Sequence, residues 1–356
     1  MESLGNFPDP FLAEIVSQPQ AIRRTAEAAA DQRDVLGRVR EAAAGRTLVF
    51  TGMGSSYDAC YPIVSDLAGR GALTLLVDAA ELLHFRRPIL TAGTIIVIVS
   101  QSGESAEIVR LAAEISGQPA HPPVVSITNG LDNGLAGLAD LRLDTRAGSE
   151  TGPSTKTFAG SLTMLAGLAR VLDGEDIDVA MDRLGDAAEE AALAAERLLA
   201  DPVTLATMLA RHLGGRDVVV LLGRGPARAA TEMGALTMKE SGLMAEALES
   251  AMFRHGPLEL AGPGMSAIVV ATEPETRSLD LSLATELVDA GAAVLVISPD
   301  GERLDGADAL ATGSSDRMLG PAVSVVPIQV LAWKLSTASG RTPGSFMRAS
   351  KVTTRE

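Results

Sequence analysis

A cluster of hydroxyl and amide side chains, Ser-Gln-Ser-Gly-Glu-Ser at residues 100–105, is the stretch of this sequence best suited to bind a small anion. It follows an unbroken apolar run at 95–99 and precedes apolar residues at helical spacing between 106 and 115. A strand therefore ends and a helix begins here, where free backbone N–H groups and the helix dipole favour negative charge. Neutral hydroxyl and amide donors suit a phosphate carried on a small molecule. Helix capping by Ser102 or Ser105 is the competing explanation.

A second set of residues could move a proton. Lys239-Glu240 lies near the end of a helical pattern rich in Met, Ala and Leu, and the motif Arg-His-Gly-Pro follows at 254–257. A carboxylate can carry a proton between carbons C2 and C1 of a sugar, and an imidazole that titrates near neutrality can assist ring opening. Taken singly, Glu240 could be a solvated helix residue and His255 a turn residue. Together they supply the groups that an aldose–ketose proton shift requires.

The surrounding sequence alternates between strand and helix patterns. We predict strands at 47–51, 73–77, 95–99, 124–128 and 141–143, and again at 218–222, 266–271 and 294–298. This alternation predicts an α/β fold with parallel sheets that carry helices on both faces. The glycine turns at 52 and 223, the strand runs from 95 and 267, and those from 124 and 294 give offsets of 171, 172 and 170 residues. Such agreement favours two copies of one α/β unit.

Five segments follow from this pattern. They are a helical N-terminal arm at 1–44, a first α/β domain at 45–172, a helical connector at 173–213, a second α/β domain at 214–340 and a C-terminal tail at 341–356. The tail has little apolar periodicity, which is typical of frayed ends.

Further polar clusters follow predicted strands of the first domain, at 54–56, 129–130 and 152–156. Ligands of open α/β sheets bind at the carboxyl ends of the strands, so these turns should converge with the one at 100–105. None has the spacing of a P-loop, and Gly52-x-Gly54 lacks the third glycine of the dinucleotide fingerprint.

Composition excludes several classes of function. The net charge of −15 argues against a nucleic-acid partner, and no segment approaches the roughly 20 apolar residues of a membrane span. The first ten residues show no secretory signal pattern, and a single cysteine, Cys60, fits a reducing cytoplasm. No Cys/His cluster has the spacing of metal ligands, so we expect neither a metal nor an organic cofactor.

Read in order, these motifs resemble the sugar isomerase (SIS) domain family. The resemblance covers residues from about 45 to the end and is closest to the isomerase half of glucosamine-6-phosphate synthase and to stand-alone SIS-type glucosamine-6-phosphate deaminases. It rests on Gly54-Ser55-Ser56-Tyr57, the turn at 100–105, Ser154-Thr155-Lys156, Lys239-Glu240, the motif at 254–257 and Lys351. It implies two tandem SIS domains, each a parallel sheet between helices in a flavodoxin-like, three-layer arrangement.

The resemblance also implies a role for each matching residue. The sugar phosphate would be bound by Ser56, Ser100, Gln101, Ser102 and Ser105, and the substrate would be lined by Gly54, Ser55 and Ser154. Glu240 would be the base between C1 and C2, and His255 would assist ring opening from across the interface of a homodimer. Lys351 would complete the catalytic set, which makes the tail an ordered lid.

Two departures from the family bear on the substrate. The synthases carry a Glu and a Lys ahead of the base where Met233 and Thr237 stand here, and they begin with a glutamine-hydrolysing domain that we do not find in this sequence. We therefore expect a cytoplasmic enzyme that converts glucosamine 6-phosphate to fructose 6-phosphate and ammonia. Two alternatives stay open: an isomerase or deglycase acting on another amino-sugar phosphate or a fructosamine phosphate, and a non-catalytic protein that binds a sugar phosphate.

Overall fold

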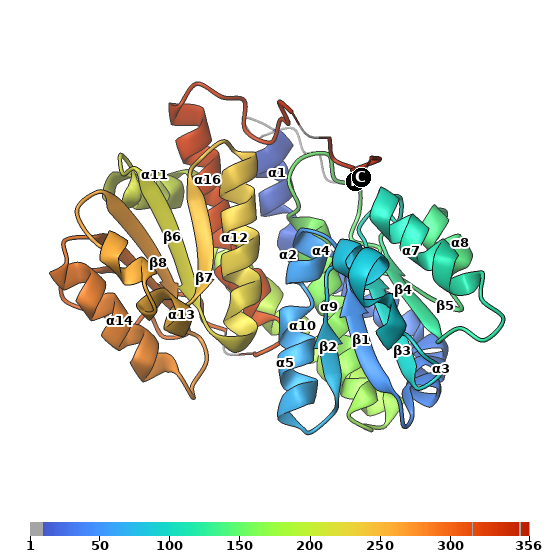
Figure 1. Cartoon of the computed structure of the whole chain (residues 1–356). Helices are drawn as coiled ribbons and strands as arrows, with labels where there is room; N and C mark the ends of the chain where they lie inside the picture. The colour runs from blue at the N-terminus through green and yellow to red at the C-terminus, as the bar shows by residue number, and fades with distance from the viewer. Residues whose placement is uncertain (1–9, 315, 349, 356) are drawn as a thin grey trace. The chain divides into compact units, whose positions relative to one another are not determined.

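The computed structural model describes residues 10–314, 316–348 and 350–355. Contacts between Cα atoms divide the chain into two compact units (Figure 1). We call the first the Ser100 unit (Gln20–Ser149, Lys156–Glu189 and Arg348–Glu356) and the second the Glu240 unit (Met1–Pro19, Glu150–Thr155 and Glu190–Met347). Each unit is built around one five-stranded sheet.

The sheet of the Ser100 unit is parallel throughout and has the strand order β2-β1-β3-β4-β5. Its strands are β1 (Thr47–Thr51), β2 (Thr74–Leu76), β3 (Thr94–Val99), β4 (Val124–Thr128) and β5 (Leu141–Asp144). The central strand β3 is buried along its whole length, because its β-branched residues pack against helices on both faces. Ile96 and Ile98 pack with Ile108 and Leu111 on one face, and the intervening residues point to the other.

Helices cover both faces of this sheet (Figure 1). One group, α7 and α8, packs on the face of Ile96 and Ile98, and a second group that includes α3, α5 and α9 makes mutual contacts. The helices of the unit are α2 (Gln18–Asp31), α3 (Arg33–Ala43), α4 (Ser55–Asp58), α5 (Tyr61–Gly69), α6 (Ala79–Glu81), α7 (Ala106–Ser116), α8 (Gly134–Leu138) and α9 (Lys156–Leu172), with a π-helical turn at Leu82–Arg86 and a 3-10 turn at Arg87–Ile89. The boundary between the units crosses α10 (Ile177–Leu198).

The Glu240 unit repeats the same sheet. Its parallel strands lie in the order β10-β9-β8-β6-β7, so β6 to β10 occupy the places of β1 to β5. They are β6 (Val218–Gly223), β7 (Ala245–Glu249), β8 (Met265–Val270), β9 (Ala293–Ser298) and β10 (Asp308–Ala311). Strands β6 and β8 begin 171 residues after β1 and β3, respectively. The predicted duplication of an α/β unit is therefore confirmed.

The helices of the Glu240 unit are α1 (Pro10–Val16), α11 (Pro202–Leu213), α12 (Arg228–Glu240), α13 (Ser250–Arg254), α14 (Arg277–Asp289), α15 (Gly320–Ser324) and α16 (Val326–Ala338), with 3-10 turns at Gly225–Ala227 and Pro257–Leu260. The N-terminal helix α1 packs into the main apolar core of this unit through Phe11, Leu12 and Ile15. Among the described residues no helix is both long and apolar enough to cross a bilayer.

Two strands of this unit were not predicted. Strand β7 has the sequence Ala-Glu-Ala-Leu-Glu and β10 has Asp-Ala-Leu-Ala, and neither contains a β-branched or aromatic residue. Both lie at the edges of the sheet, where exposed positions accept polar residues. The offset of 171 residues from β2 would have located β7.

Candidate active site

The turn at 100–105 is held by its own hydroxyl groups. The Oγ of Ser100, which is only 5% exposed, accepts a hydrogen bond from the backbone N–H of Gly103 (3.1 Å), and the Oγ of Ser102 accepts one from Glu104 (3.1 Å). Ser105 makes no side-chain capping bond to α7. Helix capping therefore does not explain these serines. Each of the first two hydroxyls still carries a proton that it can donate to an anion.

Gly103 fixes the shape of this turn. Its φ is +66°, and a Cβ atom placed on it would lie 1.9 Å from the Oδ1 of Asn133. Asn133 is itself fixed, because its Oδ1 accepts from the N–H of Ala136 (2.9 Å) and its amide donates to the carbonyl of Gly130 (2.8 Å). The turn after β3 is thus packed directly against the turn after β4.

We expect Gly103→Ala to weaken the binding of a sugar phosphate by about tenfold or more, because the left-handed conformation alone costs an L-residue roughly 1–2 kcal/mol. Contact with Asn133 adds to this. Calorimetric titration with glucosamine 6-phosphate would measure the loss. The matched control is Gly137→Ala in α8, where a Cβ atom meets no neighbour. Equal affinities in the two variants would contradict the assignment of the turn.

The turn at 54–56 lies next to the turn at 100–105. A Cβ atom on Gly52 would lie 2.9 Å from both the N atom of Tyr57 and the carbonyl oxygen of Val99, so the ends of β1 and β3 are in close contact. Gly54, with φ of +53°, leads into α4, and Ser56 on that helix is buried. The structure therefore brings Gly54, Ser55 and Ser56 together with the 100–105 turn at the carboxyl ends of neighbouring strands.

The C-terminal tail reaches the same edge of the Ser100 unit. The carbonyl of Thr353 accepts a hydrogen bond from the N–H of Ala106, the first residue of α7 (3.0 Å). This segment includes the half-buried Lys351. The tail therefore lies beside the residues that we expect to bind phosphate.

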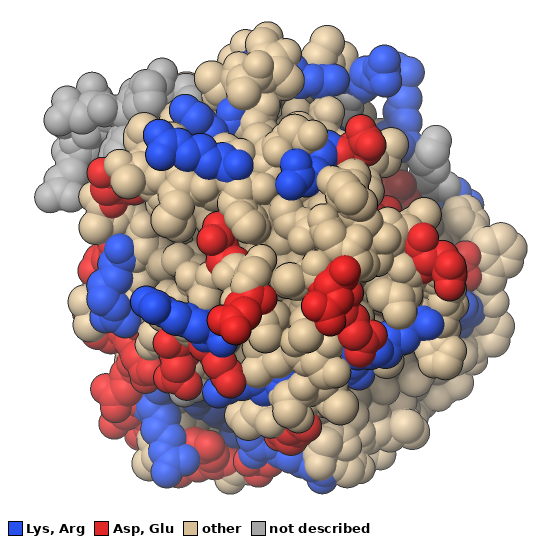
Figure 2. All heavy atoms as spheres, turned by 90° about the vertical axis from the view of Figure 1, so that its left-hand side faces the viewer, with Lys and Arg blue, Asp and Glu red and all other residues tan. Residues whose placement is uncertain are grey.

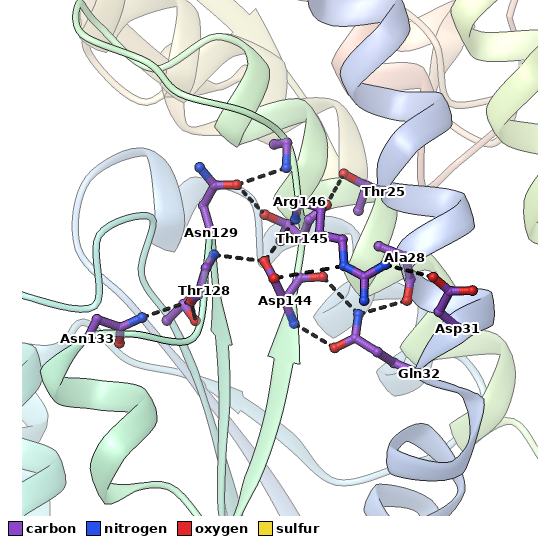
Figure 3. Close-up of polar contacts among 12 residues, drawn as sticks. Thr25, Ala28, Asp31, Gln32, Thr128, Asn129, Asn133, Asp144, Thr145 and Arg146 are labelled. Carbon is purple, nitrogen blue, oxygen red and sulfur yellow. Dashed lines mark hydrogen bonds and ion pairs between the residues drawn. The ribbon is translucent and has the colours of Figure 1, made fainter.

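A polar network at the ends of β4 and β5 supports this edge (Figure 3). The Oδ1 of Asn129 accepts from the N–H of Ala147 (2.8 Å), and its backbone N–H donates to the carbonyl of Gln101 (3.1 Å). Arg146 has a φ of +49° and is held there by Asp144, which accepts from its N–H (3.0 Å). Asn129 was singled out from the sequence. Asp144 and Arg146 were missed because no local motif marks them.

Glu240 is the last residue of α12 and lines a pocket of about 370 Å³ in its own unit. The other residues of the pocket are Ser241, Ser336, Gly340, Arg341, Thr342, Ser345 and Met347. Thr237, one turn earlier, is fully buried, and its hydroxyl donates to the carbonyl of Met233 (3.0 Å). Thr237 stands where the resemblance to the synthases would place a lysine. Its hydroxyl proton is used in a hydrogen bond within α12.

His255 lies away from this pocket. It caps α13 and is exposed to solvent, and α13 follows the carboxyl end of β7. Glu240 precedes the amino end of the same strand, so the five residues of β7, about 16 Å of extended chain, lie between them. Figure 1 shows α13 and the C-terminal end of α16 at opposite ends of this unit. Within one unit the two candidate catalytic residues are not brought together.

The loop that carries Ser154 is anchored by a buried carboxylate. Glu14 of α1, 7% exposed, accepts from the N–H groups of Thr151 (2.7 Å) and Gly152 (3.2 Å). The side chain of Gln329 donates to the carbonyl of Ser154 (3.4 Å). Sequence reasoning missed Glu14, because its partners lie more than a hundred residues away.

The second repeat has an acidic turn where the first has serines. Residues 271–273, Ala-Thr-Glu, follow β8 as residues 100–102 follow β3. Burial raises the pKa of Glu273, against the opposing charge of Arg317. Burial likewise raises the pKa of Asp280, which accepts from the guanidinium of Arg224 at 2.9 Å. These carboxylates are matched by arginines of the same unit, so this turn is unsuited to a phosphate.

Comparison with known proteins identifies relatives of this chain in sequence and in fold. The SIS domain family model matches residues 43–170. Glutamine–fructose-6-phosphate aminotransferase (isomerizing) from Thermococcus kodakarensis is 30% identical over 368 aligned residues, which are 100% of this chain and 60% of that protein. The chain thus spans less than two thirds of the length of that relative.

Solved structures share the fold. The C-terminal domain of glucosamine-fructose-6-phosphate aminotransferase from Francisella tularensis superimposes with a TM-score of 0.84 at 22% identity, covering 97% of this chain and 99% of that one. Glucosamine-6-phosphate deaminase from Thermotoga maritima gives 0.67 at 21% identity, covering 92% and 99%. The matched model identifies an SIS domain at residues 43–170, and these likenesses show that the two-sheet fold of the chain is shared with both structures.

Proposed function

We propose that this protein is a phosphosugar isomerase that acts as a deaminase, converting glucosamine 6-phosphate to fructose 6-phosphate and ammonia. The observation that carries the proposal is the turn at 100–105, where Ser100 and Ser102 hold the backbone with their oxygens and keep hydroxyl protons for an anion. A carboxylate at Glu240, lining a polar pocket, supplies the base.

The proposed reaction has four steps. The phosphate binds to the serine turns of the Ser100 unit, and His255 assists opening of the sugar ring. Glu240 then removes the proton from C2 and returns it to C1, so that the C2 amine becomes an imine. Water adds to C2, ammonia leaves, and a ketone remains. Lys351 lines the site from the tail, and the chemistry consumes one water and requires no metal or organic cofactor.

We also propose a homodimer in which His255 acts at the site of the partner subunit. The position of Glu240 and His255 at opposite ends of β7 supports this, because a single unit cannot present both to one sugar. His255 is exposed and therefore accessible to a second copy.

The expected partner is a small sugar phosphate in the cytoplasm, with neither nucleic acid nor membrane involved. Acidic and basic side chains are interspersed on the face shown in Figure 2. Many of the arginines are matched by carboxylates, as in the pairs of Arg224 with Asp280 and Arg254 with Glu286. Such pairing leaves little of the unneutralised positive charge that a phosphate backbone needs.

Incubating the purified protein with a panel of amino-sugar 6-phosphates tests the proposal. We expect release of ammonia together with fructose 6-phosphate from glucosamine 6-phosphate, and no release from the sugar without its phosphate. Release of an amine from a fructosamine phosphate would instead identify the deglycase alternative. Tight binding of the sugar phosphates with no turnover of any of them would contradict an enzymatic role.

A further inference from the structure

The pocket beside Glu240 holds more hydrogen-bonding groups than the transfer of one proton uses. Besides Glu240 it is lined by a guanidinium, Arg341, and by four hydroxyl-bearing residues, Ser241, Ser336, Thr342 and Ser345. Its volume of about 370 Å³ also exceeds what an ammonia molecule requires. These groups come from three places in the chain: the end of α12, the last turns of α16 and the segment that follows α16.

Arg341 keeps most of its donors available. The one hydrogen bond recorded for its guanidinium within the described part of the chain runs from Nη1 to the Sδ of Met347 (3.6 Å), and a thioether is a weak acceptor. No carboxylate in that part forms an ion pair with it. The guanidinium lies against Gly242, where an added Cβ would be 2.1 Å from its Cζ. The negative end of the α12 dipole favours a cation here but does not occupy the donors.

Two of the hydroxyls in the pocket lack partners. Ser241 is 4% exposed and Ser336 is 1% exposed, and neither Oγ has a hydrogen-bond partner among the residues that the structure describes. Buried polar groups in proteins are almost always hydrogen-bonded, so unpartnered ones that line a cavity indicate a missing acceptor or donor. A ligand oxygen beside Arg341 would meet the needs of both serines.

We propose that Arg341, Ser241 and Ser336 form a carboxylate-binding subsite for the amine half of a sugar–amine adduct. The inference rests on the proposed function, because it takes Glu240 as the group facing C1 and C2. Any substituent on an amine at these carbons would extend into the space beside Glu240. A planar guanidinium pairs with a carboxylate through two parallel hydrogen bonds, which makes an amino acid a better occupant than a neutral amine.

Glu240 could also act as the base in the cleavage of a sugar–amine adduct. In a ketosamine 6-phosphate the amine is on C1 and the carbonyl is on C2. Glu240 would take a proton from C1 and return it to C2, leaving a hydroxyl on C2 and a C1=N imine. Water adds to C1, the amino acid leaves with its nitrogen, and an aldose 6-phosphate remains. One water is consumed, and no oxidant or reductant is needed.

A matched pair of ligands tests the subsite by calorimetry on the full chain. One is the 6-phosphate of fructose that carries glycine on C1, and the other carries glycinamide, which has the same shape without the negative charge. We expect the native protein to bind the acid about 10- to 100-fold more tightly than the amide. Arg341→Ala should bring this ratio close to one, Arg341→Lys should keep part of it, and Ser336→Ala should lower it less.

The control variant is Arg303→Ala, which removes an exposed arginine after β9, at the carboxyl end of the second sheet and opposite to this pocket. Its ratio should match that of the native protein. Equal affinities for acid and amide in the native protein, or an unchanged ratio in Arg341→Ala, would overturn the subsite. The subsite would also be overturned if Arg341→Ala lost as much affinity for glucosamine 6-phosphate as for the acid, because Arg341 would then bind the sugar phosphate. Preference for the acid in a protein that releases no ammonia from glucosamine 6-phosphate would overturn the proposed function and leave the subsite standing.

Discussion

Replacing Glu240 with glutamine is expected to lower kcat for glucosamine 6-phosphate by about 10²–10⁴-fold, the usual contribution of a positioned general base. Glutamine keeps the size of the side chain at the end of α12 but cannot accept the proton from C2. The KM should change little, because in the proposed site the phosphate is bound by the turns of the Ser100 unit and not by Glu240. Exchange of the C2 hydrogen with deuterated water, followed by NMR, should be lost in parallel with ammonia release.

Glu246→Gln is the matched control, since Glu246 is an exposed carboxylate that pairs with Lys239 at 3.7 Å. It should retain the native kcat. Near-native turnover by Glu240→Gln would remove this residue from the catalytic role, and a large rise in KM with kcat unchanged would make it a binding group instead.

Much of the fold could be predicted, because it depends on signals that are local in sequence. The all-apolar run of β3, its abrupt change to serines and the helical spacing of α7 locate the strand, the turn and the helix without tertiary information. The constant offset of about 171 residues between the two halves of the sequence predicts the second sheet. Strands β7 and β10 escaped prediction, since their pairing with β6 and β9 outweighs a composition that favours helix or coil.

The candidate site was only partly visible in the sequence, because several of its groups act through distant contacts. The serine turns and Glu240 stand in recognisable motifs. Glu14 and Arg341 do not: one is in the first helix and holds the loop at 151–152, and the other lies a hundred residues beyond Glu240. A carboxylate in the N-terminal arm has no motif by which to recognise it. The separation of His255 from Glu240 likewise depends on the direction of β7, a strand that was not predicted.

Mixing two inactive variants should restore activity if His255 acts across a dimer. Glu240→Gln subunits lack the proposed base, and His255→Asn subunits lack the imidazole that is proposed to assist ring opening. When both are coexpressed with different tags and purified through both, every dimer is mixed. One of its two sites then carries both substitutions and the other carries neither, so the mixed dimer should recover about half of the native activity per dimer.

Recovery of activity in the mixed dimer distinguishes a site shared between two subunits from a site formed by one subunit. If one subunit supplied both residues, each site of the mixed dimer would still carry one substitution, and the preparation would stay as inactive as its parents. His255 is exposed, so its replacement should leave the fold and the thermal unfolding temperature unchanged. Each parental dimer serves as its own control. Since β7 places about 16 Å of chain between the two residues, recovery would mean that the site is completed by a second copy of the chain.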